Sequence, residues 1–196
     1  MTQATGQVVV ISGPSGSGKT SIIDQLRKHP RVRVSVSVTT RPPRQDEVDG
    51  KDYRFVDHDT FLKMVEEKAF VETNDVFGNG YLYGSTWQDV DDSLRDPEAV
   101  YIMEVDVVGA SNLRATGLGL LYIFIEPPSI DDLAHRLQNR GTEDEQQVAQ
   151  RLARAQEEMN QARLEGAHIV VNEDVDQAVE QIKKLLGLEE NASLEG

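Results

Sequence analysis

Cysteine is absent from the 196 residues of the sequence, which excludes disulfide bonds and thiol catalysis. No apolar run approaches the ~20 residues of a membrane-spanning helix, and residues 1–7 lack the charged and apolar regions of a signal peptide. Basic residues are few, with 20 Lys and Arg against 34 Asp and Glu, so the net charge is -14. This balance disfavours broad affinity for nucleic acids or anionic membranes. We therefore expect a cytoplasmic protein with neither of these partners.

The most informative motif present is a glycine-rich stretch that fits the phosphate-binding pattern G-x-x-x-x-G-K-[ST]: Gly13, Pro14, Ser15, Gly16, Ser17, Gly18, Lys19 and Thr20. An apolar run precedes it and a helix-like stretch follows. Glycines let backbone N–H groups point at a phosphate chain, and a helix N-terminus adds positive potential there. All eight residues are therefore predicted to bind ATP, with Lys19 reaching the β- and γ-phosphates and Thr20 ligating Mg²⁺. A simple Gly/Ser turn is the alternative.

Strand-like apolar runs occur at residues 8–11, 101–105, 120–125 and 167–171, and helix-like segments separate them. This alternation predicts an α/β fold with a mostly parallel sheet that has helices on both faces. Together with the phosphate-binding motif, it predicts a P-loop NTPase-type core. A capping box at residues 142–145 and apolar positions at Val148, Leu152, Ala155, Met159 and Ala162 predict an amphipathic helix. A closing helix is expected over 174–186, and a frayed tail over 189–196.

Between residues 34 and 85 the pattern changes to short alternating segments and a glycine-rich turn. We interpret this stretch as a small β-rich lobe inserted into the core. In open α/β sheets, ligands bind beyond the carboxyl ends of the strands, so an insertion there is well placed to cover a second substrate.

The inserted stretch carries two arginines, Arg41 and Arg44, separated by two prolines. Arginine forks bind phosphate oxygens in pairs, so a stiff cationic clamp is one interpretation. Surface salt bridges to Asp46, Glu47 and Asp49 are the other. Hydroxyls of Tyr53 and Tyr83 could donate to the same phosphate, although each tyrosine taken alone is better explained as a half-buried packing residue.

The chain resembles the guanylate kinase family from residue 7 to about residue 186. The resemblance rests on the P-loop and on residues 35–44, 47–53, 83–85, 104–109, 140–143 and 171–174. It implies transfer of the γ-phosphoryl of ATP to GMP with Mg²⁺, giving ADP and GDP, with dGMP as a further acceptor and a monomeric or homodimeric protein. It further implies a core of residues 1–33 and 86–188, a helical lid at about 127–165 within that core, and a GMP-binding lobe of 34–85.

The resemblance also implies roles for single residues. The GMP site would comprise Ser37, Arg41, Arg44, Tyr53, Glu72, Tyr83, Ser85 and Asp106, with Ser37, Glu72 and Ser85 reading the guanine. The ATP site would add Arg136 from the lid and Asn172 beside the adenine. The catalytic set would be Lys19, Arg41, Arg44, Arg140 and Arg151.

Chemistry makes the guanine assignment sensible, because guanine presents two donors beside its O6 acceptor and a carboxylate at Glu72 complements them. Taken alone, Glu72 would be read as an exposed strand carboxylate. A solvated, salt-bridged face is the alternative for Arg140 and Arg151, and for Arg154 it is as well supported as a role in the lid. The detailed role of Asp106 stays open.

The turn before Tyr83 departs from the family pattern, since residues 78–84 contain more residues than the usual tight turn. The phosphate-facing tyrosine could therefore be Tyr81 or Tyr83, and the Gly84-Ser85 pair that follows favours Tyr83. Two other functions remain open: a ribose bisphosphate kinase and a non-catalytic scaffold module. The presence of both Ser37 and Glu72 argues against the ribose bisphosphate kinase. The intact P-loop argues against the scaffold module.

Overall fold

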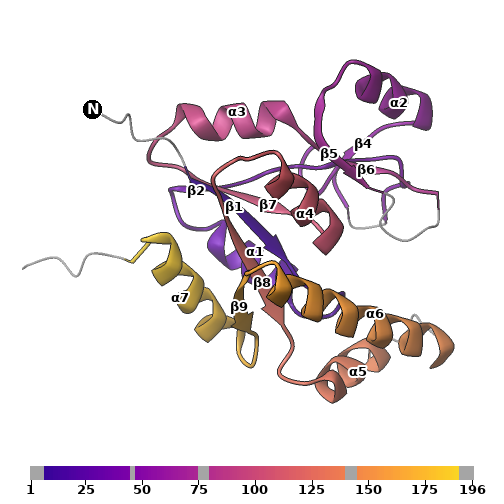
Figure 1. The fold of residues 1–196 in the computed structure, drawn as a ribbon, viewed down its shortest axis with the longest axis vertical. Coiled ribbons are helices and arrows are strands. Elements are labelled where there is room, and N and C mark those ends of the chain that lie inside the picture. Colours follow the sequence, from indigo (N-terminus) through magenta and orange to yellow (C-terminus); the bar gives the residue numbers. More distant parts are fainter. Residues whose placement is uncertain (1–6, 45–46, 75–79, 140–144, 190–196) are drawn as a thin grey trace, which may run out of the picture.

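A five-stranded parallel sheet forms the centre of the molecule. The computed structural model describes residues 7–44, 47–74, 80–139 and 145–189. The strand order is β2-β7-β1-β8-β9, and every pair of neighbours is parallel. The strands are β1 (Gln7–Ser12), β2 (Val32–Val34), β7 (Val100–Glu104), β8 (Leu120–Glu126) and β9 (His168–Val171). The predicted parallel sheet is thereby confirmed (Figure 1).

Helices cover both faces of this sheet, as the strand periodicity requires. Val9 and Ile11 of β1 belong to a core cluster that includes buried residues of α1 and α7. Val8 and Val10 point the other way, into a cluster that includes residues of α3, α4 and α6. These helices are α1 (Lys19–Leu26), α3 (Trp87–Arg95), α4 (Val107–Ala115), α6 (Glu145–Leu164) and α7 (Val175–Leu186). The predicted P-loop NTPase-type core is confirmed.

Strand β2 was not predicted from the sequence. It has three residues, of which Val32 is buried, Arg33 is exposed and Val34 is half-buried. Such a short, half-polar segment carries no recognisable period of its own. It becomes a strand because it pairs with the buried strand β7, where Val34 lies opposite Ile102.

The segment between β2 and α3 folds as a separate small sheet, which we call the lobe. Its strands are β3 (Val38–Thr39), β4 (Arg54–Phe55), β5 (Phe70–Asn74) and β6 (Tyr83–Thr86), in the order β4-β3-β6-β5. The lobe also contains the helix α2 (His58–Glu66), which the sequence analysis did not predict. Phe61 of α2 stacks on Phe70 of β5, with ring centroids 4.5 Å apart, so the helix closes one side of the small sheet.

Two helices, α5 (Ile130–Asn139) and α6, form the second appendage, which we call the lid (Figure 1). They pack through their own cluster of Leu133, Leu137, Val148 and Ala155, with Leu152 beside it. The amphipathic helix predicted from these positions is confirmed, whereas its capping box lies almost wholly outside the described residues. The lid also touches the P-loop: a Cβ on Gly16 would lie 3.0 Å from Leu133 and 3.3 Å from Leu137.

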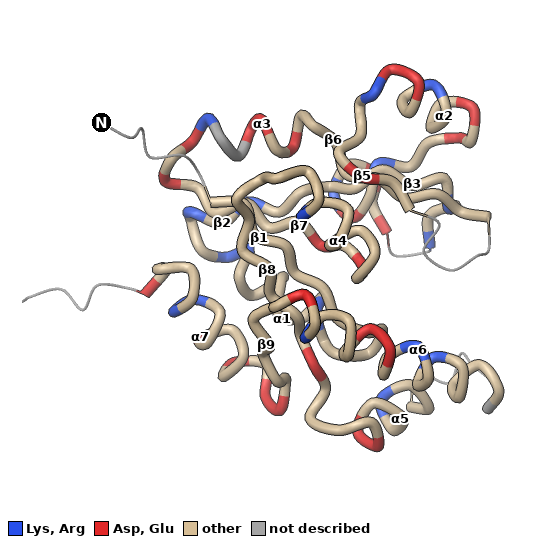
Figure 2. Tube along the Cα trace, viewed as in Figure 1, with Lys and Arg blue, Asp and Glu red and all other residues tan. Residues whose placement is uncertain are grey.

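Charged side chains of both signs are interspersed along the outer helices rather than gathered into one basic surface (Figure 2). In the part of the chain that the structure describes, every helix is too short or too polar to cross a lipid bilayer. The tail predicted for residues 189–196 falls, apart from Glu189, outside the described residues.

Candidate active site

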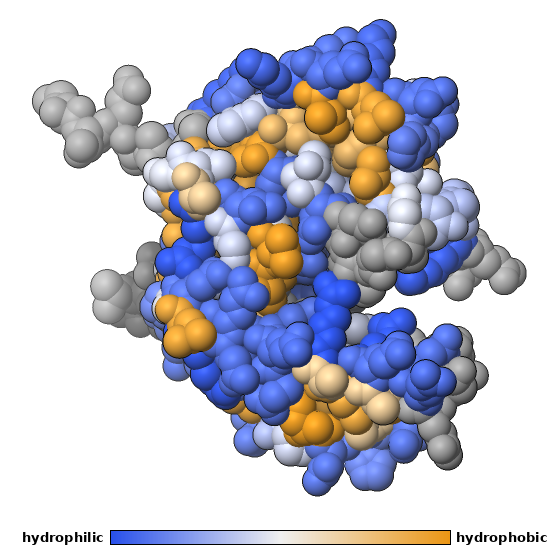
Figure 3. All heavy atoms as spheres, turned by 45° about the vertical axis from the view of Figure 1, so that its right-hand side comes forward, coloured by the Kyte–Doolittle hydropathy of each residue, from blue (hydrophilic) through white to orange (hydrophobic). Residues whose placement is uncertain are grey.

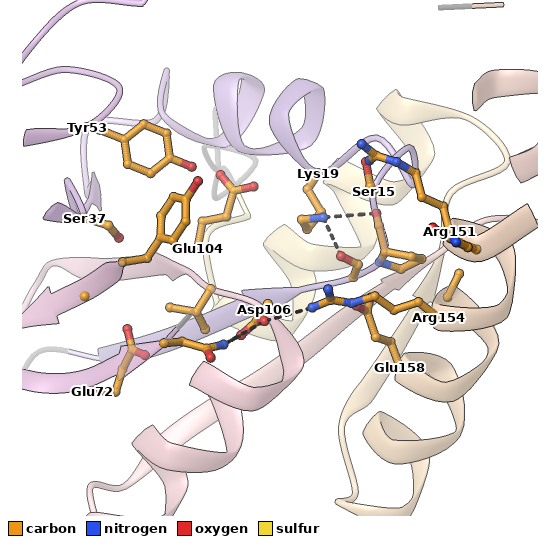
Figure 4. A pocket seen from close by; sticks show the side chains of 18 of the residues that line it. Ser15, Lys19, Ser37, Tyr53, Glu72, Glu104, Asp106, Arg151, Arg154 and Glu158 are labelled. Carbon is orange, nitrogen blue, oxygen red and sulfur yellow. Dashed lines mark hydrogen bonds and ion pairs between the residues drawn. The ribbon is translucent and has the colours of Figure 1, made fainter. Parts of the chain in front are cut away.

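A cavity of about 980 Å³ lies where the lobe, the core and the lid meet. Figure 3 shows the hollow between these parts from outside, and Figure 4 shows many of its side chains from close by. Residues of the P-loop, of the lobe, of the end of β7 and of α6 line it. Among the predicted site residues, the lining includes Gly13, Pro14, Ser15, Lys19, Ser37, Arg44, Tyr53, Glu72, Tyr83, Asp106 and Arg151.

The P-loop leaves the first backbone N–H groups of α1 without a side-chain cap. Gly18 is the N-cap residue, with a left-handed φ of 94°, and no side chain caps the helix there. Gly13 has a φ of 152°, and a Cβ at this position would lie 2.4 Å from the carbonyl oxygen of Ile125. Only glycine fits that close approach of the backbone to β8. Free N–H groups at a helix N-terminus make an anion site.

Lys19 is the first residue of α1, and its ammonium group lies within the loop itself. It donates hydrogen bonds to the carbonyl oxygens of Gly13 and Pro14, the latter at 3.1 Å. Thr20 is exposed on the same first turn. The loop therefore brings the Lys19 cation to one edge of the cavity, and the Thr20 hydroxyl follows it on the same turn, outside the cavity lining.

Two predicted ATP-site residues brace the loop from behind. The side-chain amide of Asn172 donates to the carbonyl oxygen of Ser17 at 2.7 Å, and Arg136 donates to the carbonyl oxygen of Asn172 at 3.0 Å. A Cβ on Gly18 would lie 2.2 Å from the Asn172 amide nitrogen. Asn172 is buried. In this structure both side chains hold the loop, a role that sequence reasoning did not assign to them.

Arg151 of α6 also contacts the P-loop, at Ser15. Its guanidinium donates to the hydroxyl of Ser15 at 2.8 Å. The lid thus places this predicted catalytic arginine at the phosphate loop. Arg140, the other lid arginine of the predicted catalytic set, lies outside the described residues.

On the lobe side, both arginines of the predicted clamp contact Glu47. Arg41 lies 2.7 Å from Glu47 Oε1, and the exposed Arg44 lies 3.9 Å from the same oxygen. The hydrogen bond from Arg41 holds the pKa of Glu47 below its usual range. Arg41 also lies over the ring of Tyr53, 5.4 Å from its centroid. The salt bridges weighed in the sequence analysis therefore form, with Glu47 as the acceptor.

The two predicted tyrosines lie together at this end of the cavity, with ring centroids 6.0 Å apart. Burial raises the pKa of Tyr53 to about 12, so its hydroxyl keeps its proton and can donate to an anion. Tyr83 lies in β6 and lines the cavity, whereas Tyr81 precedes the strand and is exposed. Of these two tyrosines, Tyr83 is therefore the one whose side chain lines the cavity.

Glu72 is the chemically most unusual group of the cavity. It is only 8% exposed, and its Oε1 accepts a hydrogen bond of 2.8 Å from the hydroxyl of Ser85 on the neighbouring strand. Burial raises its pKa to about 7 against the effect of this hydrogen bond. A Cβ on Gly109 would lie 3.1 Å from Oε2, so α4 leaves room for the carboxylate. The exposed strand carboxylate weighed for Glu72 is thus wrong.

Asp106 is surrounded by polar partners that the sequence analysis did not identify. It caps α4 by accepting a hydrogen bond from the N–H of Gly109 at 2.8 Å. Asn74 of the lobe and Arg154 of the lid also contact its carboxylate, and Glu158 contacts Arg154. Asn74 and Glu158 carry no motif that could have identified them. The sequence offers only one indication of each: Asn74 follows Glu72 on β5, and Glu158 follows Arg151 on α6.

A parallel sheet that presents a P-loop to a cavity between a lobe and a helical lid defines the class of P-loop phosphotransferases. Comparison with known proteins gives the family. The guanylate kinase family model matches residues 5–189, and the chain belongs to the guanylate kinase family.

Named relatives agree with this assignment over nearly the whole chain. The guanylate kinase of Nitratidesulfovibrio vulgaris is 43% identical, covering 92% of this chain and 86% of its own length. That of Synechocystis sp. is 39% identical, covering 96% and 97%. A crystal structure of guanylate kinase from Anaplasma phagocytophilum, 27% identical, superposes with a TM-score of 0.72 and covers 97% of this chain and 89% of that one.

Proposed function

We propose that this protein transfers the γ-phosphoryl group of ATP to GMP, giving ADP and GDP. The observation that carries this proposal is the placement of buried Glu72, hydrogen-bonded to Ser85, in the same cavity as the P-loop lysine. A cavity that holds a phosphate loop at one end and a buried carboxylate at the other suits a donor nucleotide and an acceptor with a base to be recognised.

Glu72 would read the guanine. An ionised carboxylate accepts hydrogen bonds from the N1–H and the exocyclic amino group, and the hydroxyls of Ser37 and Ser85 suit the remaining polar atoms of the base. Adenine lacks the N1 proton and has reversed polarity at position 6. AMP would therefore leave a buried carboxylate unpaired, which is a large penalty.

The phosphate of GMP would be held at the lobe end of the cavity. Arg44, Tyr53 and Tyr83 line that end, and Arg41 stands behind Tyr53. Because Arg41 and Arg44 share Glu47 in this structure, the phosphate would take over contacts that Glu47 now makes. The two guanidinium groups of the proposed clamp would thus already lie near one another before the substrate arrives.

At the other end, the P-loop and the lid would hold ATP. The open N-terminus of α1 and Lys19 suit the β- and γ-phosphates, and Arg151 already lies beside Ser15. Lid and lobe would close toward each other, aligning donor and acceptor and excluding water, so that the phosphoryl group passes to GMP rather than to water.

Mg²⁺ fits this site as an ion carried by the nucleotide. Among the described residues, no group of three or more His, Asp or Glu side chains could hold a metal. The exposed hydroxyl of Thr20 on the first turn of α1 is the protein ligand that would reach it, with ATP oxygens and water completing the shell. When bound, the ion would offset charge on the phosphates.

The direct test of the proposed function is release of ADP from Mg-ATP across a panel of acceptors. GMP should support turnover, and AMP, CMP, UMP and ribose 1,5-bisphosphate should support little. A preference for ribose 1,5-bisphosphate would assign the protein to another kinase type. Absence of turnover with the whole panel would point to a binding module instead.

The pKa of Glu72 makes a prediction about pH. The carboxylate must be ionised to accept from guanine, and its pKa is raised to about 7, so acidification below that value removes the acceptor. We expect kcat/KM for GMP to fall by about tenfold per pH unit below pH 7, while the KM for ATP changes little. A flat profile between about pH 5.5 and pH 8 would show that Glu72 does not bind the base in its ionised form.

Replacement of Arg44 by alanine should separate the two substrates. The loss of a charge-assisted contact to phosphate should raise the KM for GMP by about tenfold or more and leave the KM for ATP within about twofold. Arg95→Ala is the matched control, because Arg95 is as exposed as Arg44 and pairs with an acid three residues away, outside the cavity. Equal changes in both KM values would place Arg44 outside the acceptor site.

A further inference from the structure

Asp106 lies at the point where the core, the lobe and the lid meet. Its Oδ1 accepts from the N–H of Gly109 on α4 at 2.8 Å. The side-chain amide of Asn74, at the end of β5 in the lobe, lies 2.9 Å from both carboxylate oxygens. From the lid helix α6, Nη2 of Arg154 lies 3.5 Å from Oδ2. One carboxylate therefore links all three parts of the molecule, as Figure 4 shows for Arg154 and Asp106.

Arg154 lies between two acids. Its Nε donates to Glu158 Oε1 at 2.8 Å, one helical turn further along α6. The Asp106 and Glu158 side chains are largely buried, with 14% and 16% of their surface exposed, whereas Arg154 is 39% exposed. Burial raises the pKa of Glu158, and the contact with Arg154 works against that rise. The guanidinium is thus the cation that both carboxylates share.

Asp106, the partner of Arg154, acts in turn on Glu72, the base-reading group of the proposed acceptor site. Glu72 Oε2 faces Gly109, on the same first turn of α4 that Asp106 caps. Ser85 from β6 and Asp106 from the β7–α4 junction act on the Glu72 carboxylate directly. The other charged side chains that line the same cavity are Lys19, Arg44, Glu104, Arg151, Arg154 and Glu158, and Lys68 lines an adjoining groove. Burial raises the pKa of Glu72, Ser85 works against this, and the negative charge of Asp106 raises it further.

We propose that Arg154 is a positioning residue of the acceptor site: from the lid helix it holds Asp106 against Asn74 and offsets the negative charge beside Glu72. The inference rests on the proposed function, since it concerns how the guanine-reading carboxylate is kept ready. A less neutralised Asp106 would favour protonation of Glu72, and a protonated Glu72 presents a donor where guanine also presents donors. Arg154 acts through Asp106 and needs no contact with either nucleotide.

The test compares Arg154→Gln with wild type in steady-state kinetics at about pH 7 and about pH 9. At the lower pH we expect the KM for GMP to rise about fivefold and the KM for ATP to stay within about twofold. At the higher pH Glu72 is ionised in both proteins, so the difference in KM for GMP should shrink to less than about twofold. Arg154→Lys keeps the charge and should restore at least part of the loss.

Arg114→Gln is the matched control. Arg114 is also 39% exposed and connects α4 to Glu165, the residue that follows α6, at 3.2 Å, but it lies outside the cavity lining. It should leave both KM values within about twofold. Melting temperatures of all variants check folding, and calorimetric binding of GMP without ATP gives a readout independent of turnover.

The outcomes separate the inference from the proposed function. If wild type phosphorylates GMP and Arg154→Gln keeps the wild-type KM for GMP, Arg154 has no such role. Equal losses for GMP and ATP, or a loss that persists at about pH 9, would also overturn it, since these indicate a general effect on the lid. If wild type neither binds nor phosphorylates GMP, the proposed function itself fails.

Discussion

Lys19→Ala is expected to reduce phosphoryl transfer by about a thousandfold or more, the largest effect of any single change considered for this protein. The ammonium group lies within the P-loop beside the uncapped N-terminus of α1, where the loop would hold the β- and γ-phosphates. It would offset the charge that builds up as the bond to the leaving oxygen loosens, and this contribution belongs to the transition state. The fall should therefore appear in kcat.

GMP binding should survive the same change, because in the proposed function Lys19 serves the phosphates of ATP, whereas Arg44 and Glu72 serve GMP. Calorimetry with GMP alone measures this. Lys28→Ala, at an exposed lysine just beyond α1, removes the same charge away from the loop and should leave turnover unchanged. Near wild-type turnover in Lys19→Ala would remove the P-loop from the mechanism.

Glu72→Gln should abolish most of the discrimination between guanine and adenine. Wild type is expected to favour GMP over AMP by about 10⁴ in kcat/KM, the range found where a mismatched base leaves buried polar groups unpaired. The amide keeps the shape of the side chain but turns one acceptor into a donor that faces guanine's own donors. We expect kcat/KM for GMP to fall by about 10³, corresponding to about 4 kcal/mol, and that for AMP to fall by less than about tenfold.

The pH profile provides an independent check on this variant. Glutamine does not titrate, so the loss of activity toward GMP below pH 7 that we expect for wild type should disappear in Glu72→Gln. Glu66→Gln makes the same change at an exposed position on α2 of the lobe and should preserve both nucleotide preference and pH profile. An unchanged ratio of GMP to AMP activity in Glu72→Gln would mean that this side chain does not read the base.

The sequence could not show whether Glu72 is buried or exposed, because the residues that surround its carboxylate are distant in the chain. Its position in a short strand suits an exposed carboxylate, and only the pairing of β5 with β6 places Ser85 opposite it. Burial of the carboxylate then follows from α4, whose Gly109 leaves it space. None of these neighbours lies within ten residues of Glu72 in the chain, so no local pattern could have indicated them.

The arginines show the same limit in a different way. Sequence reasoning left a phosphate clamp and surface salt bridges as alternatives for Arg41 and Arg44, and the structure shows Glu47 bridging the two. For Arg136 and Asn172, spacing could not show that they brace the carbonyl of Ser17, since 119 and 155 residues separate them from it. Arg154 was left undecided because a lid arginine and a solvated helix face have the same sequence pattern.

The sequence by itself determined the P-loop, the parallel core and the family, because each rests on short blocks of neighbouring residues and on the order of those blocks along the chain. A phosphate loop requires its glycines in consecutive order between a strand and a helix, and buried strands require continuous apolar runs. Only the tertiary structure decided which side chains share the cavity. The contacts of Asp106 with Asn74 and Arg154 span 32 and 48 residues of chain. Such contacts depend on how lobe, core and lid pack, and packing is a property of the folded chain as a whole.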